Sequence, residues 1–263
     1  MRKIMQNKIP LISIITPNYN CGRFIAQTIE SVLAQTYTNW EMLIVDDCST
    51  DNSYQIALEY AQKDSRIKVF QNEKNSGAAI SRNKAIELSQ GEYLAFLDSD
   101  DLWLPEKLEK QLQFMQENDC DFSFTEYEHI DEENNSLLKV AKVIKRLSYK
   151  KMLMHCWPGC LTVMYSQKNG KIYGPDIKKN NDHALFLRVL KNSQNAKGFP
   201  IILAKYRIRN GSISSKKTSI IKYYLKVVHE FEKNPYFFAV FCIFTHVIVK
   251  AFLKYRRIPS VSH

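Results

Sequence analysis

The chain has 263 residues, of which 45% are hydrophobic and 24% charged, a composition typical of a folded globular protein rather than a disordered one. Its net charge of +10 suits an anionic partner, but no nucleic-acid-binding motif is present, so we expect no nucleic-acid partner. No secretory signal is recognisable, because residues 1–8 are polar and the apolar run at 9–15 is short and broken by Pro10. The six scattered cysteines are therefore expected to be reduced, in a cytoplasmic protein.

In the first half of the chain, patterns typical of strands and helices alternate. Short apolar runs predict strands at 11–16, 41–45, 67–70 and 93–97. Apolar residues at helical spacing predict the helices between them, at 22–35, 51–63 and 78–89. This order predicts an α/β fold with a doubly wound, mostly parallel sheet flanked by helices.

The fourth predicted strand ends in three aspartates within four residues, Asp98, Asp100 and Asp101. Because three neighbouring carboxylates repel one another, we expect a positive partner there, and a divalent cation with oxygen ligands is the natural candidate. Ligands of open α/β sheets also bind at the carboxyl ends of the strands. One aspartate could instead cap the helix expected near Pro105, but capping does not account for all three.

Two further polar loops follow predicted strands at the same edge of the sheet. The loop at 16–20 carries Tyr19, and the loop at 45–47 carries Asp46 and Asp47. A ring that stacks and a carboxylate that accepts N–H bonds together suit a planar heterocycle such as a nucleobase. Each residue also has an ordinary interpretation, because Tyr19 could pack on its turn and Asp46 could cap a helix.

Four segments in this half resemble the successive motifs of the family 2 glycosyltransferases. They are SIITPNYN at 13–20, EMLIVDDCSTDNS at 41–53, NSGAAISRNKAI at 75–86 and EYLAFLDSDDLWLP at 92–105. The resemblance extends over residues 11–117 and includes the Asp-Xaa-Asp motif at 98–100. It implies the GT-A fold and an enzyme that uses a nucleotide-sugar donor.

The resemblance also implies a pocket for the base of the donor. Tyr19 would lie against the base, Pro17 would line the same pocket, and Asp47 would accept a hydrogen bond from a base N–H. Asp46 would support the loop that carries Asp47.

The remaining donor contacts that the resemblance implies involve the ribose and the diphosphate. Arg82 would reach the phosphates, while Asp98 and the adjacent Ser99 would lie near the ribose. Asp100 would bind a Mg²⁺ or Mn²⁺ ion that bridges the diphosphate. Such an ion offsets the negative charge that develops on the leaving group.

The second half of the chain has a less regular pattern. We expect strands at 121–127, 138–144, 160–165 and 201–204, and helices at 148–154 and 181–190. The resemblance makes Asp182, at the start of the last of these helices, the general base that takes the proton of the acceptor hydroxyl. Spacing alone would equally allow Asp182 to be a helix cap.

Two positions in this half bear on metal binding. Many relatives have a histidine that helps to hold the metal or diphosphate where this chain has Arg209, which can pair with phosphate but cannot ligate a cation. His155, Cys156 and Cys160 lie close together, but the second ligand cluster that a zinc site would need is not found.

We divide the chain into a catalytic domain at 1–215 and a helical tail at 216–263. Within the domain, residues 1–117 would form the nucleotide-sugar half and residues 118–215 the acceptor half. The tail contains a mostly apolar run at 236–249, about 21 Å long as a helix and shorter than the bilayer core, with basic residues directly after it. This predicts a helix on an anionic membrane surface, at the inner face of the cell membrane. The alternative is a helix packed on the domain, or at a contact between two copies in a homo-oligomer.

Together these features predict an inverting glycosyltransferase for surface polysaccharide or lipooligosaccharide synthesis. It would move a hexosyl or N-acetylhexosaminyl group from a UDP-sugar to a glycan or lipid-linked acceptor in a single displacement. One alternative is an inactive sugar-nucleotide-binding or scaffold protein, although the acidic residues expected of an enzyme are all present. The other is a nucleotidyltransferase, which would need a glycine-rich, lysine-containing loop after the first strand, and residues 18–22 are not such a loop.

Overall fold

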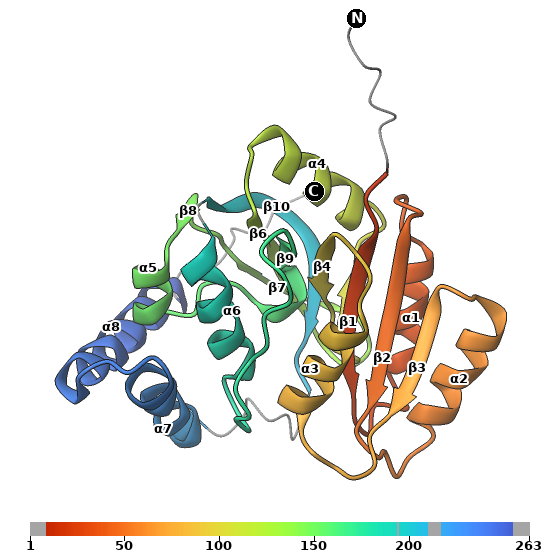
Figure 1. Cartoon of the computed structure of the whole chain (residues 1–263), viewed down its shortest axis with the longest axis horizontal. Helices are drawn as coiled ribbons and strands as arrows, with labels where there is room; N and C mark the ends of the chain where they lie inside the picture. Colours follow the sequence, from red (N-terminus) through yellow and green to blue (C-terminus); the bar gives the residue numbers. More distant parts are fainter. Residues whose placement is uncertain (1–8, 194, 210–216, 255–263) are drawn as a thin grey trace, which may run out of the picture.

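The computed structural model describes residues 9–193, 195–209 and 217–254. These residues form one ten-stranded sheet with helices on both faces (Figure 1). The strand order is β3-β2-β1-β4-β9-β6-β10-β5, with β7 paired to β6 and β8 paired to β10. The predicted α/β architecture is therefore confirmed.

The first four strands are parallel neighbours. They are β1 (Ile12–Asn18), β2 (Trp40–Asp46), β3 (Ile67–Gln71) and β4 (Tyr93–Phe96). Every residue of β1 and β2 is buried, which explains why their sequences lack polar alternation. In the register of this pair, Asn18 lies opposite Asp46, so that both strands end at the same edge.

Two apolar cores lie on the two faces of the sheet. The helices α1 (Ile25–Leu33), α2 (Ser53–Lys63) and α4 (Lys107–Glu117) cover one face. The helices α3 (Ala78–Leu88) and α6 (Asn181–Asn192) cover the other. Successive strand residues divide between these cores, as Ile14 and Ile15 do, because side chains alternate along a strand.

The second half of the chain makes the sheet mixed. Its strands are β5 (Leu102–Trp103), β6 (Phe122–Ile130), β7 (Ser136–Ala141), β8 (Arg146–Leu147), β9 (Met164–Ser166) and β10 (Ala196–Arg207). β6 and β10 are parallel, whereas β9 is antiparallel to both β4 and β6. The strand expected at 160–165 is in fact a 3₁₀ turn, η1 (Cys160–Thr162), followed by β9.

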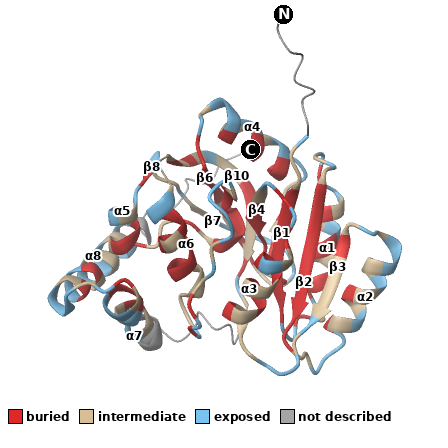
Figure 2. Cartoon of the chain, viewed as in Figure 1, coloured by how far each residue is buried: buried red, intermediate tan, exposed pale blue. Residues whose placement is uncertain are grey.

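The C-terminal helices pack against the end of the molecule that carries α6. They are α5 (Tyr149–Met154), α7 (Lys217–Lys226), a π-helical turn η3 (Val227–Phe231) and α8 (Tyr236–Lys254). Buried residues of η3 and α8, such as Val228 and Cys242, belong to the same core as those of α6. The other side of α8 is exposed (Figure 2). The tail helix expected at 236–249 is present and longer than expected, and the boundary at 215 stays a prediction.

Candidate active site

The carboxyl ends of β1 and β2 are joined by a buried polar network. The Asn18 Nδ2 donates to Asp46 Oδ1 at 2.7 Å and to Ser53 Oγ at 3.1 Å. Asp46 is fully buried and also accepts from the backbone N–H of Ser49 at 2.9 Å. These bonds fix the loop that carries Asp47, because buried carboxylates need hydrogen-bond partners.

Asp47 has a structural task that the sequence did not predict. Its Oδ1 accepts from Asn72 Nδ2 and from the Ser76 N–H, each at 2.8 Å, and its Oδ2 accepts from the Gly77 N–H at 2.7 Å. Gly77 has a φ of 89°, a conformation that favours glycine, and directly precedes α3. A carboxylate can accept about four hydrogen bonds, and the described contacts of the buried Asp47 account for three, one of them on Oδ2.

The other two residues of the predicted base pocket differ in accessibility. The side chain of Tyr19, just beyond β1, is 46% exposed and available for stacking. Pro17 is buried within β1, where it lies opposite Val45 of β2. The predicted roles of Tyr19, Pro17 and Asp47 in binding a base stay predictions.

The three clustered aspartates have three different environments. Asp101 is 1% exposed, its Oδ1 accepts from the Arg207 N–H at 2.9 Å, and burial raises its pKa well above the ordinary value. Asp98 is partly exposed and its Oδ1 accepts from Arg82 Nη2 at 2.9 Å. Asp100 forms an ion pair with Arg209, with Nε and Oδ2 2.7 Å apart, and burial raises the pKa of this carboxyl. Two of the three aspartates, Asp98 and Asp100, therefore pair with arginine side chains of the chain itself, and the expected divalent cation stays a prediction.

The residues at this cluster fit a divalent cation only in part. Among the residues that the structure describes, no group of three His, Cys, Asp or Glu side chains could hold a metal ion. Mg²⁺ is commonly bound by one or two carboxylates together with substrate phosphates and water. Asp100, with Asp98 near it, can supply the carboxylates, and the diphosphate would have to supply the rest.

Arg82 connects this cluster with the start of α6. The guanidinium is almost completely buried, and its Nη2 bonds Asp98 while its Nη1 donates to Asn181 Oδ1. Its Nε is buried and has no hydrogen-bond partner among the described residues. Burial alone would lower the pKa of Arg82, but neighbouring acidic groups, Asp98 and Asp182 among them, raise it, so the group stays cationic.

Asp182 lies at this junction, in the first turn of α6. The preceding turn reverses at Asn180, whose φ of 56° is left-handed, and Asp182 Oδ1 accepts from the His183 N–H at 2.8 Å. The side chain is partly exposed. The fold thus brings Asp182 near Asp98 through Arg82 and Asn181, although the two aspartates are far apart in the sequence. Its role as general base stays a prediction.

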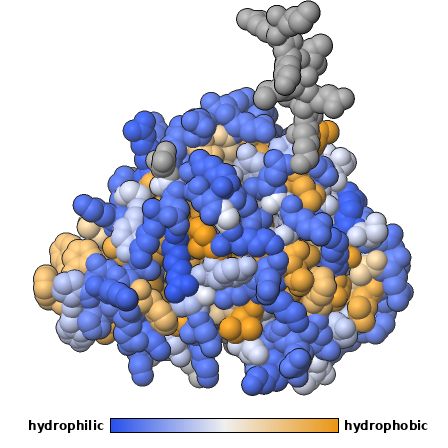
Figure 3. Space-filling view, in the orientation of Figure 1, coloured by the Kyte–Doolittle hydropathy of each residue, from blue (hydrophilic) through white to orange (hydrophobic). Residues whose placement is uncertain are grey.

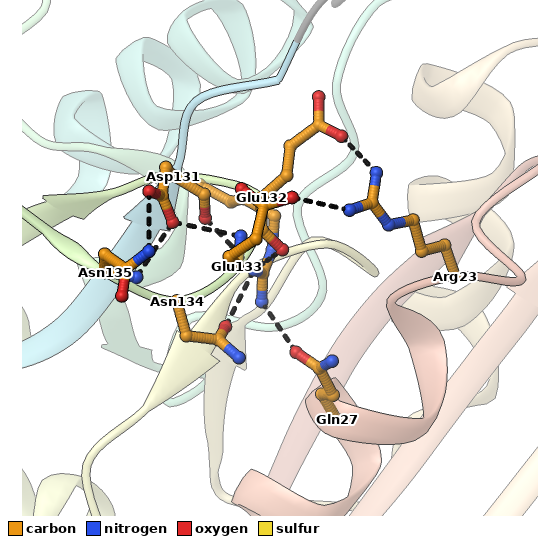
Figure 4. Close-up of polar contacts among 8 residues, drawn as sticks. Arg23, Gln27, Asp131, Glu132, Glu133, Asn134 and Asn135 are labelled. Atoms are coloured by element: carbon orange, nitrogen blue, oxygen red, sulfur yellow. Dashed lines mark hydrogen bonds and ion pairs between the residues drawn. The ribbon is translucent and has the colours of Figure 1, made fainter.

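An acidic turn that sequence reasoning did not connect with the site borders the Asp100 loop. Arg207 Nε donates to the carbonyl oxygen of Asp100 at 2.8 Å, and its Nη1 donates to Asn134 Oδ1 at 2.7 Å. Arg23 pairs with Glu132 and Glu133 of the same turn, and Gln27 of α1 approaches this turn from the same side as Arg23 (Figure 4). The available signal for this contact was Arg207, three residues after the strand predicted at 201–204.

Ser99 contributes its backbone to the same region. Its carbonyl oxygen accepts from Thr28 Oγ1 of α1 at 3.1 Å, and the residue is buried. The carbonyl oxygen of Asp101 accepts from the same hydroxyl at 2.9 Å. These bonds attach the aspartate loop to α1, and a contact of Ser99 with a ribose stays a prediction.

Comparisons with known proteins agree with this arrangement. The model of glycosyl transferase family 2 matches residues 13–169. The chain is 45% identical over 239 residues to the putative teichuronic acid biosynthesis glycosyltransferase TuaG of Bacillus subtilis, covering 90% of this chain and 95% of TuaG. It is 40% identical to WfgD of Escherichia coli, covering 86% of this chain and 88% of WfgD. WfgD is a UDP-Glc:α-D-GlcNAc-diphosphoundecaprenol β-1,3-glucosyltransferase.

Solved glycosyltransferases share the fold. The S. aureus TarS fragment 1–349, crystallised with UDP-GlcNAc, superposes with a TM-score of 0.67 at 22% identity. The match covers 83% of this chain and 66% of the TarS chain, slightly less than two thirds of it. The mannosyltransferase PcManGT of Pyrobaculum calidifontis, in complex with GDP-Man and Mn²⁺, superposes with a TM-score of 0.65 at 14% identity, covering 95% of this chain and 72% of its own. Motifs, fold and relatives agree that this chain belongs to glycosyl transferase family 2 and is a glycosyltransferase with the GT-A fold.

Proposed function

We propose that the protein transfers a sugar, with inversion, from a UDP-sugar to a lipid-linked acceptor in the synthesis of a surface polysaccharide. The observation that carries this proposal is the Arg82 junction, which places the aspartates after β4 beside the first turn of α6. The aspartates proposed to bind the donor and the Asp182 proposed to activate the acceptor therefore lie on either side of one arginine. The names of TuaG and WfgD support a surface polysaccharide and a lipid-linked acceptor.

In the proposed reaction, each residue acts on one part of the substrates. Tyr19 stacks on the base, and Asp47 accepts a hydrogen bond from a base N–H through Oδ2, which has one described partner. Asp100, with Asp98 beside it, would hold a Mg²⁺ or Mn²⁺ ion, which when bound would offset the charge of the diphosphate. Asp182 accepts the proton of the acceptor hydroxyl as the acceptor oxygen attacks the anomeric carbon on the side opposite the nucleoside diphosphate, which leaves as its bond to that carbon breaks.

The experiment is a screen of the purified protein against a panel of nucleotide sugars, with donor hydrolysis as the readout. We expect one UDP-sugar to be hydrolysed in the presence of Mg²⁺ or Mn²⁺. Calorimetry with UDP distinguishes the enzyme from an inactive sugar-nucleotide-binding protein, because such a protein would bind UDP but hydrolyse none of the donors. Hydrolysis of only a GDP- or dTDP-sugar would contradict the proposed UDP-sugar donor but would still agree with a sugar-transfer reaction.

We further propose that α8 attaches the protein to the anionic inner face of the cell membrane. Its inner side is buried at Ala239 and Cys242, whereas Phe237, Phe244 and Phe252 on its other side are between 63 and 76% exposed. Apolar atoms accordingly gather at the edge of the molecule that carries α8 (Figure 3). No helix among the described residues is both long and apolar enough to cross a membrane. Exposed apolar area together with the cationic Lys250 suits a helix that lies in the interface.

Cosedimentation with liposomes tests this attachment. The double variant Phe237→Ser/Phe244→Ser should release the protein from anionic liposomes and leave UDP binding unchanged. The matched control is Leu138→Ser, because Leu138 is 68% exposed on β7 and lies outside α8. Equal sedimentation of both variants would refute the proposal. Loss of a dimer in the double variant, measured by light scattering, would instead assign the face to a second copy of the chain.

A further inference from the structure

The predicted metal ligand Asp100 is already paired within the protein. Arg209 Nε lies 2.7 Å from Asp100 Oδ2, and the two side chains are 27% and 18% exposed. Arg209 Nη1 also donates to Cys21 Sγ at 3.4 Å, and its guanidinium lies 5.9 Å from the centre of the Phe24 ring. Three segments of the chain, after β1, β4 and β10, therefore meet at this ion pair.

The pair opposes binding of a divalent cation on its own. A cation bound to the Asp100 carboxylate would lie within a few ångströms of the Arg209 guanidinium, and at this partly buried position water screens their repulsion only weakly. The cation would also share a carboxylate whose charge Arg209 already neutralises. Because no group of three suitable ligands exists among the described residues, the protein alone offers little to compensate for this.

A diphosphate removes this opposition. It supplies oxygen ligands for the cation, and it gives Arg209 a second acceptor, since a guanidinium pairs with phosphate through two parallel hydrogen bonds. The Asp100 carboxylate is then free for the cation. We propose that Arg209 exchanges Asp100 for the donor diphosphate, and that this exchange makes the divalent cation bind together with the nucleotide and only weakly without it. This inference rests on the proposed function, because it needs a nucleoside diphosphate in this site.

The neighbouring arginine shows why Arg209 is suited to such an exchange. Arg207 is 2% exposed and donates to the Asp100 carbonyl, the Asn134 side chain and the Gln27 side chain, so it is fixed in place. Arg209, in contrast, is partly exposed, and within the described part of the chain its side chain contacts a carboxylate, a thiol and an aromatic ring. Moving it breaks the ion pair with Asp100, the hydrogen bond to Cys21 Sγ and the contact with the Phe24 ring, but no backbone contact that the described residues show.

The test measures Mn²⁺ binding by electron paramagnetic resonance, with and without saturating UDP. In the parent protein, UDP should tighten Mn²⁺ binding at least tenfold, and by linkage Mn²⁺ should tighten UDP binding by the same factor. In Arg209→Gln, Mn²⁺ should bind more tightly than in the parent when UDP is absent, and UDP should increase its affinity less. Asp100→Asn should lose the Mn²⁺ site in both conditions.

The matched control is Arg23→Gln, because Arg23 lies 5.3 Å from the same Phe24 ring but pairs with Glu132 and Glu133 instead of Asp100. It should show the Mn²⁺ affinities of the parent. Circular dichroism and thermal unfolding check that each variant is folded. The inference is wrong if folded Arg209→Gln binds UDP and UDP tightens its Mn²⁺ binding by the same factor as in the parent. It is also wrong if this variant binds Mn²⁺ less tightly than the parent when UDP is absent. If the parent binds neither UDP nor GDP, the proposed function fails together with the inference, which distinguishes this outcome from failure of the inference alone.

Discussion

Replacement of Arg82 by glutamine should disrupt the junction between the donor side and the start of α6. Removing one partner of a fully buried ion pair destabilises a protein by roughly 3–5 kcal/mol. Arg82 is buried, but the Asp98 side chain is 35% exposed and water can solvate it, so we halve this to about 2 kcal/mol. In a chain of this length, that free energy corresponds to a loss of about 4–8 °C in Tm.

The same variant should lose far more activity than its modest loss of stability would explain. Without the contact from Arg82 to Asn181, the first turn of α6 and its Asp182 are no longer held toward Asp98. A misplacement of about 1 Å can lower a rate by a factor on the order of 10². We therefore expect kcat to fall about 10²-fold, with Arg82→Lys between the parent and the glutamine variant because lysine keeps the charge but not the two-sided contact.

Steady-state kinetics and scanning calorimetry provide the two measurements. The matched control is Arg66→Gln. Arg66 also pairs with an aspartate, Asp64, at 2.7 Å, but its side chain is more exposed than that of Arg82 and lies away from the aspartate loop. It should lose at most about 1 kcal/mol, as exposed pairs do, and keep the parent kcat. If Arg82→Gln is folded and transfers sugar at the parent rate, the junction has no part in the reaction.

Three further predictions concern the base, the metal and the buried histidines. Asp182→Asn should lower transfer by at least roughly 10²-fold with UDP affinity unchanged in calorimetry, and an unchanged rate would place the base elsewhere. Asp100→Ala should lose nearly all transfer and remain folded, whereas full parent activity in excess EDTA would contradict a metal role. Burial lowers the pKa of His155 to about 3 and those of His183 and His246 to about 4, with the nearby Lys250 acting in the same direction on His155 and His246. Because these values lie below the ordinary value of about 6.5, the unfolded chain binds more protons below that pH, and stability should fall as the pH falls from 6.5 toward 4. At pH 5, a fully buried imidazole such as that of His183 lowers the free energy of unfolding by up to about 2 kcal/mol relative to neutral pH. The Tm of His183→Gln should therefore depend less on pH than the Tm of the parent or of the exposed His229→Gln control.

The first half of the fold could be predicted from the sequence because local patterns determine it. β1, β2 and β4 are almost completely buried and mostly apolar, whereas β3 is only partly buried and its apolar residues flank Lys68. Each of the four strands lies within two residues of its predicted range. Parallel strands that all end at one edge then place Tyr19, Asp47 and Asp98 near that edge without further information.

Other features depend on partners that are distant in the sequence. Asp98, Asp100 and Asp101 have the same side chain, yet they differ because Arg82, Arg209 and the Arg207 N–H reach them from elsewhere. No local pattern distinguishes them.

The length of β10 was underestimated for a related reason. It pairs with β6 over Ala196–Arg207, but two shifts in register, after Phe199 and after Ile202, interrupt the alternation that would identify a long strand. Pro200 lies within this irregular stretch, where the lack of an N–H is tolerated. Pairing with a partner strand, which the sequence of β10 alone does not reveal, maintains the strand across these interruptions.

The end of α5 connects the predicted base to the tail. The last three carbonyl oxygens of this helix, Met152–Met154, have no partner within it and accept in turn from side chains of three other helices. His183 Nε2 of α6 donates at 2.8 Å, the Tyr224 hydroxyl of α7 at 2.6 Å and the Thr245 hydroxyl of α8 at 3.2 Å. Because His183 directly follows Asp182, the helix that carries the predicted base and the helix with the exposed aromatic face are held by the same short segment. A bilayer bound to α8 would therefore fix the orientation of Asp182 relative to the lipid surface, which is what an acceptor anchored in that surface requires.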